Sequence, residues 1–182
     1  MKIKVIIFLA MLSSLTSFGQ SNNTSSSKVT IKNTFSFQTI KAYQESAVFK
    51  IRDYYNYLEL YASESTSDTL RLQLKATLHN LFVDEAQKVV DFTTSENKPI
   101  ALSKLLDKIK NKNYKFNVSS IENSIVAQDF WTTKYNLEVL ENNQRCTLEV
   151  FTKVIFKPIQ KNFGTKKREV WTLFLGDMES EE

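Results

Sequence analysis

Two hydrophobic periods divide this chain. Between residues 39 and 61, apolar side chains return every third or fourth position, which predicts a long helix with one buried face. The residues on that face are Ile40, Tyr43, Ala47, Ile51, Tyr54, Leu58 and Tyr61. After residue 113 the period falls to two, which predicts β-strands with one polar face. We therefore expect the helices to come first in the chain and most of the strands to follow them.

Two shorter helices are predicted between these regions. Ser65 and Asp68 have the spacing of a capping box, so we expect the second helix to begin there. Its buried residues are expected to be Leu70, Leu74, Leu78 and Leu81. Residues 87–92 then indicate a short strand. Pro99 suits the first turn of a third helix over 99–111, because the N–H that proline lacks would be unpaired there. The buried side of that helix consists of Leu102, Leu105, Leu106 and Ile109.

Four strands are predicted in the rest of the chain. The first covers part of 114–127 and the second covers 131–139. Asn142 and Asn143 offer a hairpin turn to the third strand, because asparagine tolerates positive φ. A loop at 161–167, which contains Gly164, leads to the fourth strand at 169–175. Segregated helices and an antiparallel sheet of four or more strands predict the α+β class.

A known family shows the same order of elements. The chain has Leu-Phe-Val-Asp-Glu-Ala at 81–86, Val-Val-Asp at 89–91 and Val-Trp-Thr-Leu at 170–173. With the third helix, these stretches resemble the NTF2-like superfamily (the SnoaL-like and cystatin-like cone folds) over about residues 39–178. The resemblance implies helices packed on a bent antiparallel sheet that forms a cone. A cystatin-like arrangement, with one helix on a curved sheet, is the alternative, but the extra helices count against it.

The two ends of the chain differ from this domain. Residues 1–19 combine an early Lys2 and Lys4, an apolar run at 5–12 and small residues at 17 and 19, which is the pattern of a cleaved signal peptide. The polar, serine-rich stretch 20–38 predicts a flexible tether, and 179–182 an acidic tail. We expect an exported bacterial protein, periplasmic or extracellular, with no membrane span after signal cleavage.

Charge adds little to this picture. The formal net charge is +4 and falls to +2 once Lys2 and Lys4 are removed, which gives no reason to expect a nucleic-acid partner. A basic cluster near the end of the chain is interpreted as a solvated loop, with binding of a polyanion or a membrane surface as the alternative. Its residues are Lys157, Lys161, Lys166, Lys167 and Arg168.

Few residues offer catalytic or metal chemistry. One histidine, His79, and one cysteine, Cys146, give no metal-ligand spacing. Cys146 lies in an alternating apolar stretch, so we expect a buried core thiol, with a reactive or intermolecular thiol as the alternative. Three glycines in the whole chain exclude the clustered glycines of nucleotide loops. No catalytic residue, metal or cofactor is therefore predicted.

The resemblance to cone folds implies a cavity that holds a small molecule. Five residues are candidates for lining it, although a role in the core is the simpler interpretation for the aromatic ones. These residues are Tyr54, Tyr61, Asp129, Trp131 and Trp171. Tyr55 and Tyr57 lie off the buried face of the long helix, so they are candidates for an exposed surface that contacts a protein partner or a second copy of the chain.

Three functions agree with these observations. The first is an exported, non-catalytic module that binds a ligand, such as a small apolar molecule, or a protein. The second is a small-molecule enzyme or carrier of the isomerase or dehydratase kind, using the cone cavity. The third is a structural part of an envelope assembly.

Overall fold

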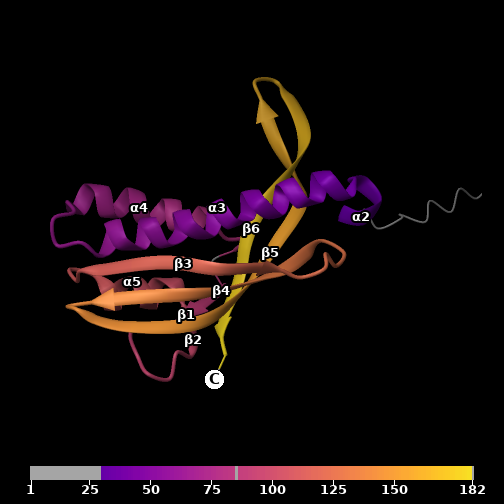
Figure 1. Cartoon of the computed structure of the whole chain (residues 1–182). Coiled ribbons are helices and arrows are strands. Elements are labelled where there is room, and N and C mark those ends of the chain that lie inside the picture. The colour runs from indigo at the N-terminus through magenta and orange to yellow at the C-terminus, as the bar shows by residue number, and fades with distance from the viewer. Residues whose placement is uncertain (1–29, 85, 182) are drawn as a thin grey trace, which may run out of the picture.

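The computed structural model describes residues 30–84 and 86–181. It confirms the α+β class, with the helices mainly before the strands and a four-stranded antiparallel sheet as the main sheet. In Figure 1, the long helix and its neighbour run side by side along the sheet. The predicted signal peptide and residues 20–29 of the predicted tether lie outside the described residues.

The long helix is confirmed and begins earlier than predicted. Helix α3 spans Phe37–Ala62, and Ser36 caps it by accepting a hydrogen bond of 3.2 Å from the backbone N–H of Thr39. A short helix α2, Ile31–Thr34, precedes it. Ile31 is only 1% exposed and its N–H donates to the carbonyl of Gln128, so the expected tether is wrong from residue 31 onward.

The second helix begins after a different cap. Helix α4 spans Asp68–Asn80, and its N-cap is Ser67, whose hydroxyl accepts from the N–H of Leu70. The predicted capping box is wrong because the Ser65 hydroxyl is hydrogen-bonded to Ser63 instead. Leu74, Leu78 and Leu81 are buried as predicted, but Leu70 is 41% exposed and its neighbour Arg71 is buried in its place.

A small two-stranded sheet separates α4 from the last helix. Strand β1, Lys88–Val90, pairs with β2, Pro99–Ala101, and Pro99 lies opposite Val90. The prediction that Pro99 begins a helix is wrong, because proline also fits the first residue of a strand, where no ladder N–H is required. Helix α5, Leu102–Ile109, follows, and its four predicted apolar residues are all buried.

The main sheet contains the four predicted strands, which pair in chain order as an antiparallel meander. Its order is β3 (Tyr114–Asn123), β4 (Phe130–Glu141), β5 (Gln144–Phe163) and β6 (Lys166–Ser180). The alternation in β4 is confirmed, since five alternate residues are buried: Trp131, Thr133, Tyr135, Leu137 and Val139. Asn142 and Asn143 have φ values of 48° and 67°, so they form the predicted hairpin turn.

The last two strands are longer than predicted. The expected loop at 161–167 is wrong, because β5 continues to Phe163 and pairs there with Lys166 across a turn at Gly164, whose φ is +62°. We call residues 157–172, the end of the β5–β6 hairpin, the arm; its outer part projects beyond the body of the protein in Figure 1. At the other end, β6 includes Glu179 and Ser180 of the predicted acidic tail.

Cys146 is exposed, so the expected buried thiol is wrong. It lies opposite Val139 on the strand face that carries the buried Leu148 and Val150. However, it is close to the turn between β4 and β5, where the neighbouring Arg145 and Thr147 are also exposed. The predicted alternation of side chains along this strand is therefore correct. However, the inward-facing side chains are no longer buried near this end of the strand, where Cys146 lies.

Candidate ligand-binding groove

The structure distributes the five predicted pocket residues between the core and the surface. Tyr54 and Trp131 are each 1% exposed and belong to the core, whereas Asp129 is exposed. Tyr61 is also buried, but it borders a hollow of about 280 Å³ together with Arg71 and other residues of α4. Of the five residues, Tyr61 alone lines one of the best-formed hollows of the described residues.

Aromatic side chains pack closely around Phe156 in the interior of the fold. Phe156 of β5 is completely buried, and four aromatic rings surround it. Their centroids lie at 4.2 Å (Tyr43), 5.0 Å (Trp171), 5.4 Å (Phe35) and 6.4 Å (Trp131) from that of Phe156. Trp171 is half-buried and packs against the core in this way. The centroid of its ring also lies 5.0 Å from that of Phe35.

The predicted interface residues are both less accessible than expected. Tyr55 is 3% exposed, and its hydroxyl lies 2.9 Å from that of Tyr135, which lies 2.9 Å from the hydroxyl of Thr152. Burial raises the pKa of Tyr135 to about 12, although the two hydrogen bonds act in the opposite direction. The expected exposure of Tyr55 is thus wrong, because its polar end has a partner on the sheet. Tyr57 is half-buried and packs against the core.

A buried carboxylate lies just after β1. The Asp91 side chain is 4% exposed and accepts hydrogen bonds from Lys108 at 2.5 Å and from the Thr93 hydroxyl at 2.6 Å. Burial alone raises the pKa of Asp91, but the bonds from Lys108 and Thr93 outweigh it, so the pKa is below its ordinary value. The ionised carboxylate therefore stabilises the fold by holding α5 beside β1.

This lowered pKa predicts a pH dependence of stability. Ionised Asp91 contributes fully to the free energy of unfolding when the pH is above the pKa of an aspartate in the unfolded chain, about 3.9. This contribution disappears as the pH falls through the lower pKa that Asp91 has in the folded protein. Asp91→Asn should therefore be less stable than the wild type at neutral pH, and the difference should shrink between about pH 5 and about pH 2. Urea unfolding of both proteins at a series of pH values measures this difference in stability. A difference that stays constant over this range would contradict a lowered pKa of Asp91.

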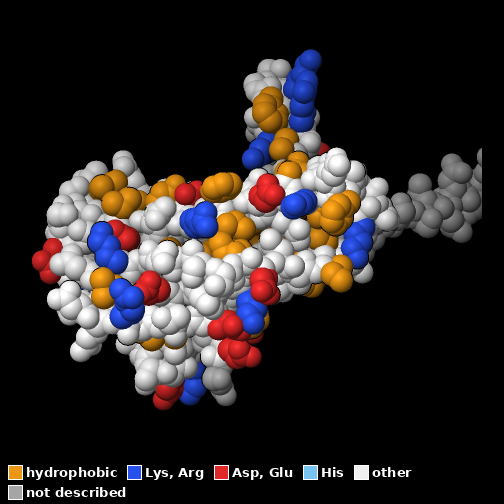
Figure 2. Space-filling view, in the orientation of Figure 1, with side chains coloured by type: hydrophobic (Ala, Val, Ile, Leu, Met, Phe, Trp, Pro, Cys, Tyr) orange, Lys and Arg blue, Asp and Glu red, His pale blue; other side chains and the backbone are white. Residues whose placement is uncertain are grey.

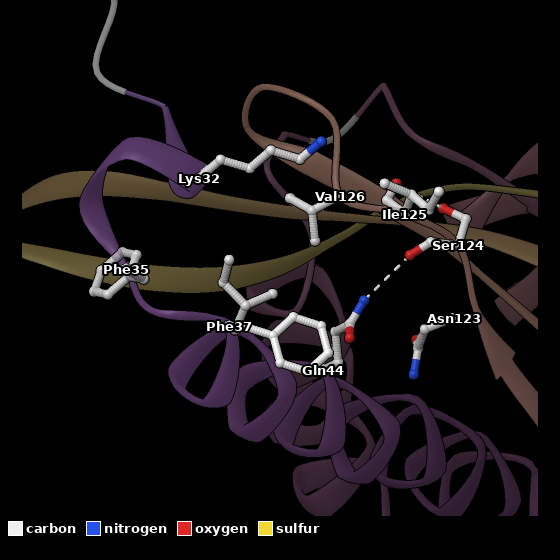
Figure 3. A pocket seen from close by; sticks show the side chains of 9 residues that line it. Lys32, Phe35, Phe37, Gln44, Asn123, Ser124, Ile125 and Val126 are labelled. Carbon is white, nitrogen blue, oxygen red and sulfur yellow. Dashed lines mark hydrogen bonds between the residues drawn. The ribbon is translucent and has the colours of Figure 1, made fainter.

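A mainly apolar hollow lies at the beginning of α3. It is a groove of about 460 Å³ between the α2–α3 segment and the loop that joins β3 to β4. Nine residues line it: Lys32, Phe35, Phe37, Ile40, Gln44, Asn123, Ser124, Ile125 and Val126. Figure 3 shows these side chains converging on the groove from both sides. We refer to it below as the groove.

Hydrogen bonds hold the two walls of the groove together. The Gln44 side-chain amide donates to the carbonyl of Ser124 across the groove, at 3.2 Å (Figure 3). The N–H of Ile31 donates to the carbonyl of Gln128, which fastens α2 to the same loop. Ser124 is in turn bonded to Thr132 of β4 through both its backbone N–H and its hydroxyl. The groove is thus largely formed before any ligand arrives.

The floor and the rim of the groove differ in exposure. Val126 is buried and Phe35 and Ile40 are half-buried, so they provide an apolar floor. Phe37 and Ile125 at the rim are 81% and 86% exposed. Contact between a large apolar side chain and water is unfavourable. A partner that covers such a side chain removes it from water, and this contributes favourably to the free energy of binding.

Among the described residues, one charged side chain lines the groove. Lys32 is exposed and extends from α2 towards the β3–β4 loop (Figure 3), whereas the other polar lining residues, Gln44, Asn123 and Ser124, are neutral. An ammonium group beside an apolar surface favours a ligand with an anionic group at one end. The arrangement suits an amphipathic molecule.

The sequence pattern did not reveal the groove. Phe37 fell within the predicted tether, and Ile125 and Val126 fell near the end of a predicted strand. The available signal was two isolated apolar positions in polar surroundings, at 35–37 and 125–126. Such positions indicate a binding site only once the fold is known to place them on opposite sides of one hollow.

Other chemical features of the described residues are few. In the part of the chain that the structure covers, no helix is long and apolar enough to cross a membrane. The same residues contain no group of three or more histidine, cysteine and acidic side chains that would hold a metal ion. Comparison with protein-family models and with curated proteins finds none that matches this chain.

Proposed function

We propose that this protein is an exported, non-catalytic module that binds a small amphipathic ligand in the groove. The apolar part of the ligand lies on Phe35, Ile40 and Val126, between the rim residues Phe37 and Ile125. The anionic end lies beside Lys32. The observation that carries this proposal is the pair of almost fully exposed apolar side chains that face one preformed hollow.

Size and lining both support a small molecule. Ligand sites usually have volumes of about 300–1,000 Å³ and combine an apolar lining with a few polar groups. The groove, at about 460 Å³, falls within this range. A saturated chain of about ten carbons with a carboxylate head has suitable dimensions and chemistry, so decanoate is a reasonable probe.

A fluorescence titration tests the proposal. The dye 8-anilinonaphthalene-1-sulfonate, which is apolar and anionic, should bind the purified protein, and decanoate should displace it. Phe37→Ser and Ile125→Ser should each weaken binding of the dye by about fivefold to tenfold, because each removes apolar area that the ligand covers. Lys32→Gln should weaken binding of decanoate but leave binding of neutral decanol unchanged.

A matched control separates the groove from general surface apolarity. Leu72 on α4 is 72% exposed and is not part of the groove, so Leu72→Ser should leave dye binding unchanged. Equal losses in Leu72→Ser and Ile125→Ser would show non-specific adsorption and contradict the proposal. Retention of full affinity in both rim variants would contradict it as well.

A further inference from the structure

The arm has two chemically different faces. In an antiparallel ladder, residues directly opposite each other point to the same side. The pairs Phe163–Lys166, Lys161–Arg168 and Lys157–Thr172 therefore share one side, and the pairs Asn162–Lys167 and Gln160–Glu169 share the other. We call the first side the cationic face; its charged residues are Lys157, Lys161, Lys166 and Arg168.

The charge of the cationic face is not neutralised. Four of the five cations of the arm lie on it, and the one acidic residue of the arm, Glu169, lies on the opposite side. Among the described residues, no carboxylate lies within ion-pair distance of Lys161, Lys166 or Arg168. Figure 2 shows basic side chains gathered on the projecting arm.

An aromatic ring lies at the tip of this charged surface. Phe163 is the last residue of β5, directly before the turn, and is 54% exposed. Every residue from 160 to 169 is exposed, so the outer part of the arm has no contact that would bury it. A two-stranded ribbon of this kind is only marginally stable by itself in water. Phe163 therefore exposes an apolar ring to solvent at the end of a ribbon that the body of the protein does not cover.

We propose that the arm docks this protein on the surface of a membrane that contains anionic phospholipids. Phe163 enters the boundary between head groups and acyl chains, and the cationic face lies against the lipid phosphates. Basic residues near such a surface each contribute a favourable electrostatic attraction, and an apolar side chain at the tip adds insertion.

The shape of the arm favours a membrane over a strand-like polyanion. Proteins that bind single-stranded nucleic acid do so with a positively charged groove that follows the backbone. The arm is instead a projection that carries four cations along one side and an apolar ring at its tip on the same side, so the tip can enter a soft surface while the cations lie against it. A lipid interface offers both the negative charge and the apolar interior that this combination matches.

Flotation with lipid vesicles tests the inference. The protein should float with vesicles that contain phosphatidylglycerol, should not float with pure phosphatidylcholine vesicles, and should dissociate as salt is added. Lys166→Gln combined with Arg168→Gln should lower the partition coefficient about thirtyfold, which corresponds to about fivefold for each charge. Phe163→Ser should lower it about tenfold without changing the net charge.

A second pair of lysines provides the control for charge. Lys41 and Lys104 are exposed and lie on helices, so Lys41→Gln combined with Lys104→Gln removes the same charge away from the arm. This control should change the partition coefficient by no more than about twofold. Equal losses in the two double variants would overturn the inference, as would full binding by Phe163→Ser. Tighter binding to polyphosphate or DNA than to the vesicles would also overturn it, in favour of a polyanion site.

Discussion

Phe156→Ala should lower the free energy of unfolding by about 3–5 kcal/mol, the usual cost of truncating a buried phenylalanine. Phe156 is fully buried and lies among four aromatic rings, with Tyr43 and Trp171 nearest. Alanine leaves a cavity that these rings are too constrained to fill, so the loss includes both transfer and cavity terms. Urea unfolding followed by tryptophan fluorescence measures it, because Trp131 and Trp171 both lie next to the site.

The same strand supplies the control for this prediction. Phe163 is also on β5 but is 54% exposed and lies in the arm, so Phe163→Ala should change stability by no more than about 0.5 kcal/mol. If Phe156→Ala cost as little as Phe163→Ala, the rings around Phe156 would be loosely packed. An open interior, as the cone-fold resemblance implies, would then become the better description.

The second large effect is expected at Arg71. Its guanidinium donates to the carbonyl of Tyr61 at 3.2 Å and to that of Ser63 at 2.7 Å, where α3 ends. The last carbonyls of a helix have no partner within the helix, and the C-terminal end of the helix dipole attracts positive charge. Arg71 therefore joins α4 to the end of α3. Arg71→Met should lower the free energy of unfolding by about 2–3 kcal/mol, because the buried carbonyl of Tyr61 loses a donor and the part-buried carbonyl of Ser63 keeps only the N–H of Thr66.

Two further variants show whether the guanidinium itself matters. Arg71→Lys keeps the charge but loses the planar arrangement of donors, so its loss should be intermediate. Asp68→Asn removes the ion pair of 3.3 Å with Arg71, but the Asp68 side chain is 85% exposed, so the cost should stay below about 1 kcal/mol. Urea unfolding compares the three variants. Similar losses for Arg71→Met and Asp68→Asn would mean that the helix-end contacts contribute little.

Long, regular patterns made much of the fold predictable. The apolar period in α3 and the alternation in β4 extend over many residues, so each is supported by several independent positions. Short local signals were less reliable. Ser65, Ser67 and Pro99 each fit more than one local structure, and tertiary contacts decide between them. The outer part of the arm, residues 161–167, was predicted as a loop around Gly164 because its charged residues hide the alternation, whereas the structure has a tight turn at Gly164 between two paired strands.

The candidate site was much less predictable than the fold. Tyr54 and Trp131 were predicted as aromatic residues of a pocket or of the core, and only packing shows that they belong to the core. The groove depends on Phe37 and Ile125, which are far apart in the sequence and lie in segments without a period. Nothing local places them on opposite walls, because their proximity results from the way α2 and α3 dock against the β3–β4 loop.

The buried Tyr55–Tyr135–Thr152 chain had a partial signal in the sequence. The alternation in β4 correctly places Tyr135 on the buried face, where a tyrosine hydroxyl requires a partner. Tyr55, however, was assigned to the surface because it lies beside the main apolar face of α3. A helix that packs against both a sheet and a second helix buries a wider face than one row of residues, and this explains the error.

The proposed groove is tested most directly by following backbone amide and tryptophan indole N–H signals by NMR during a titration with decanoate. We predict saturable shifts for Gln44, Ser124 and the indole of Trp171, which contacts the lining residue Phe35. The indole of Trp131, which is buried in the core, should stay unchanged. Saturable shifts of Trp131 and Tyr54 without shifts in the groove would contradict the proposal and would place the ligand in the interior of the fold.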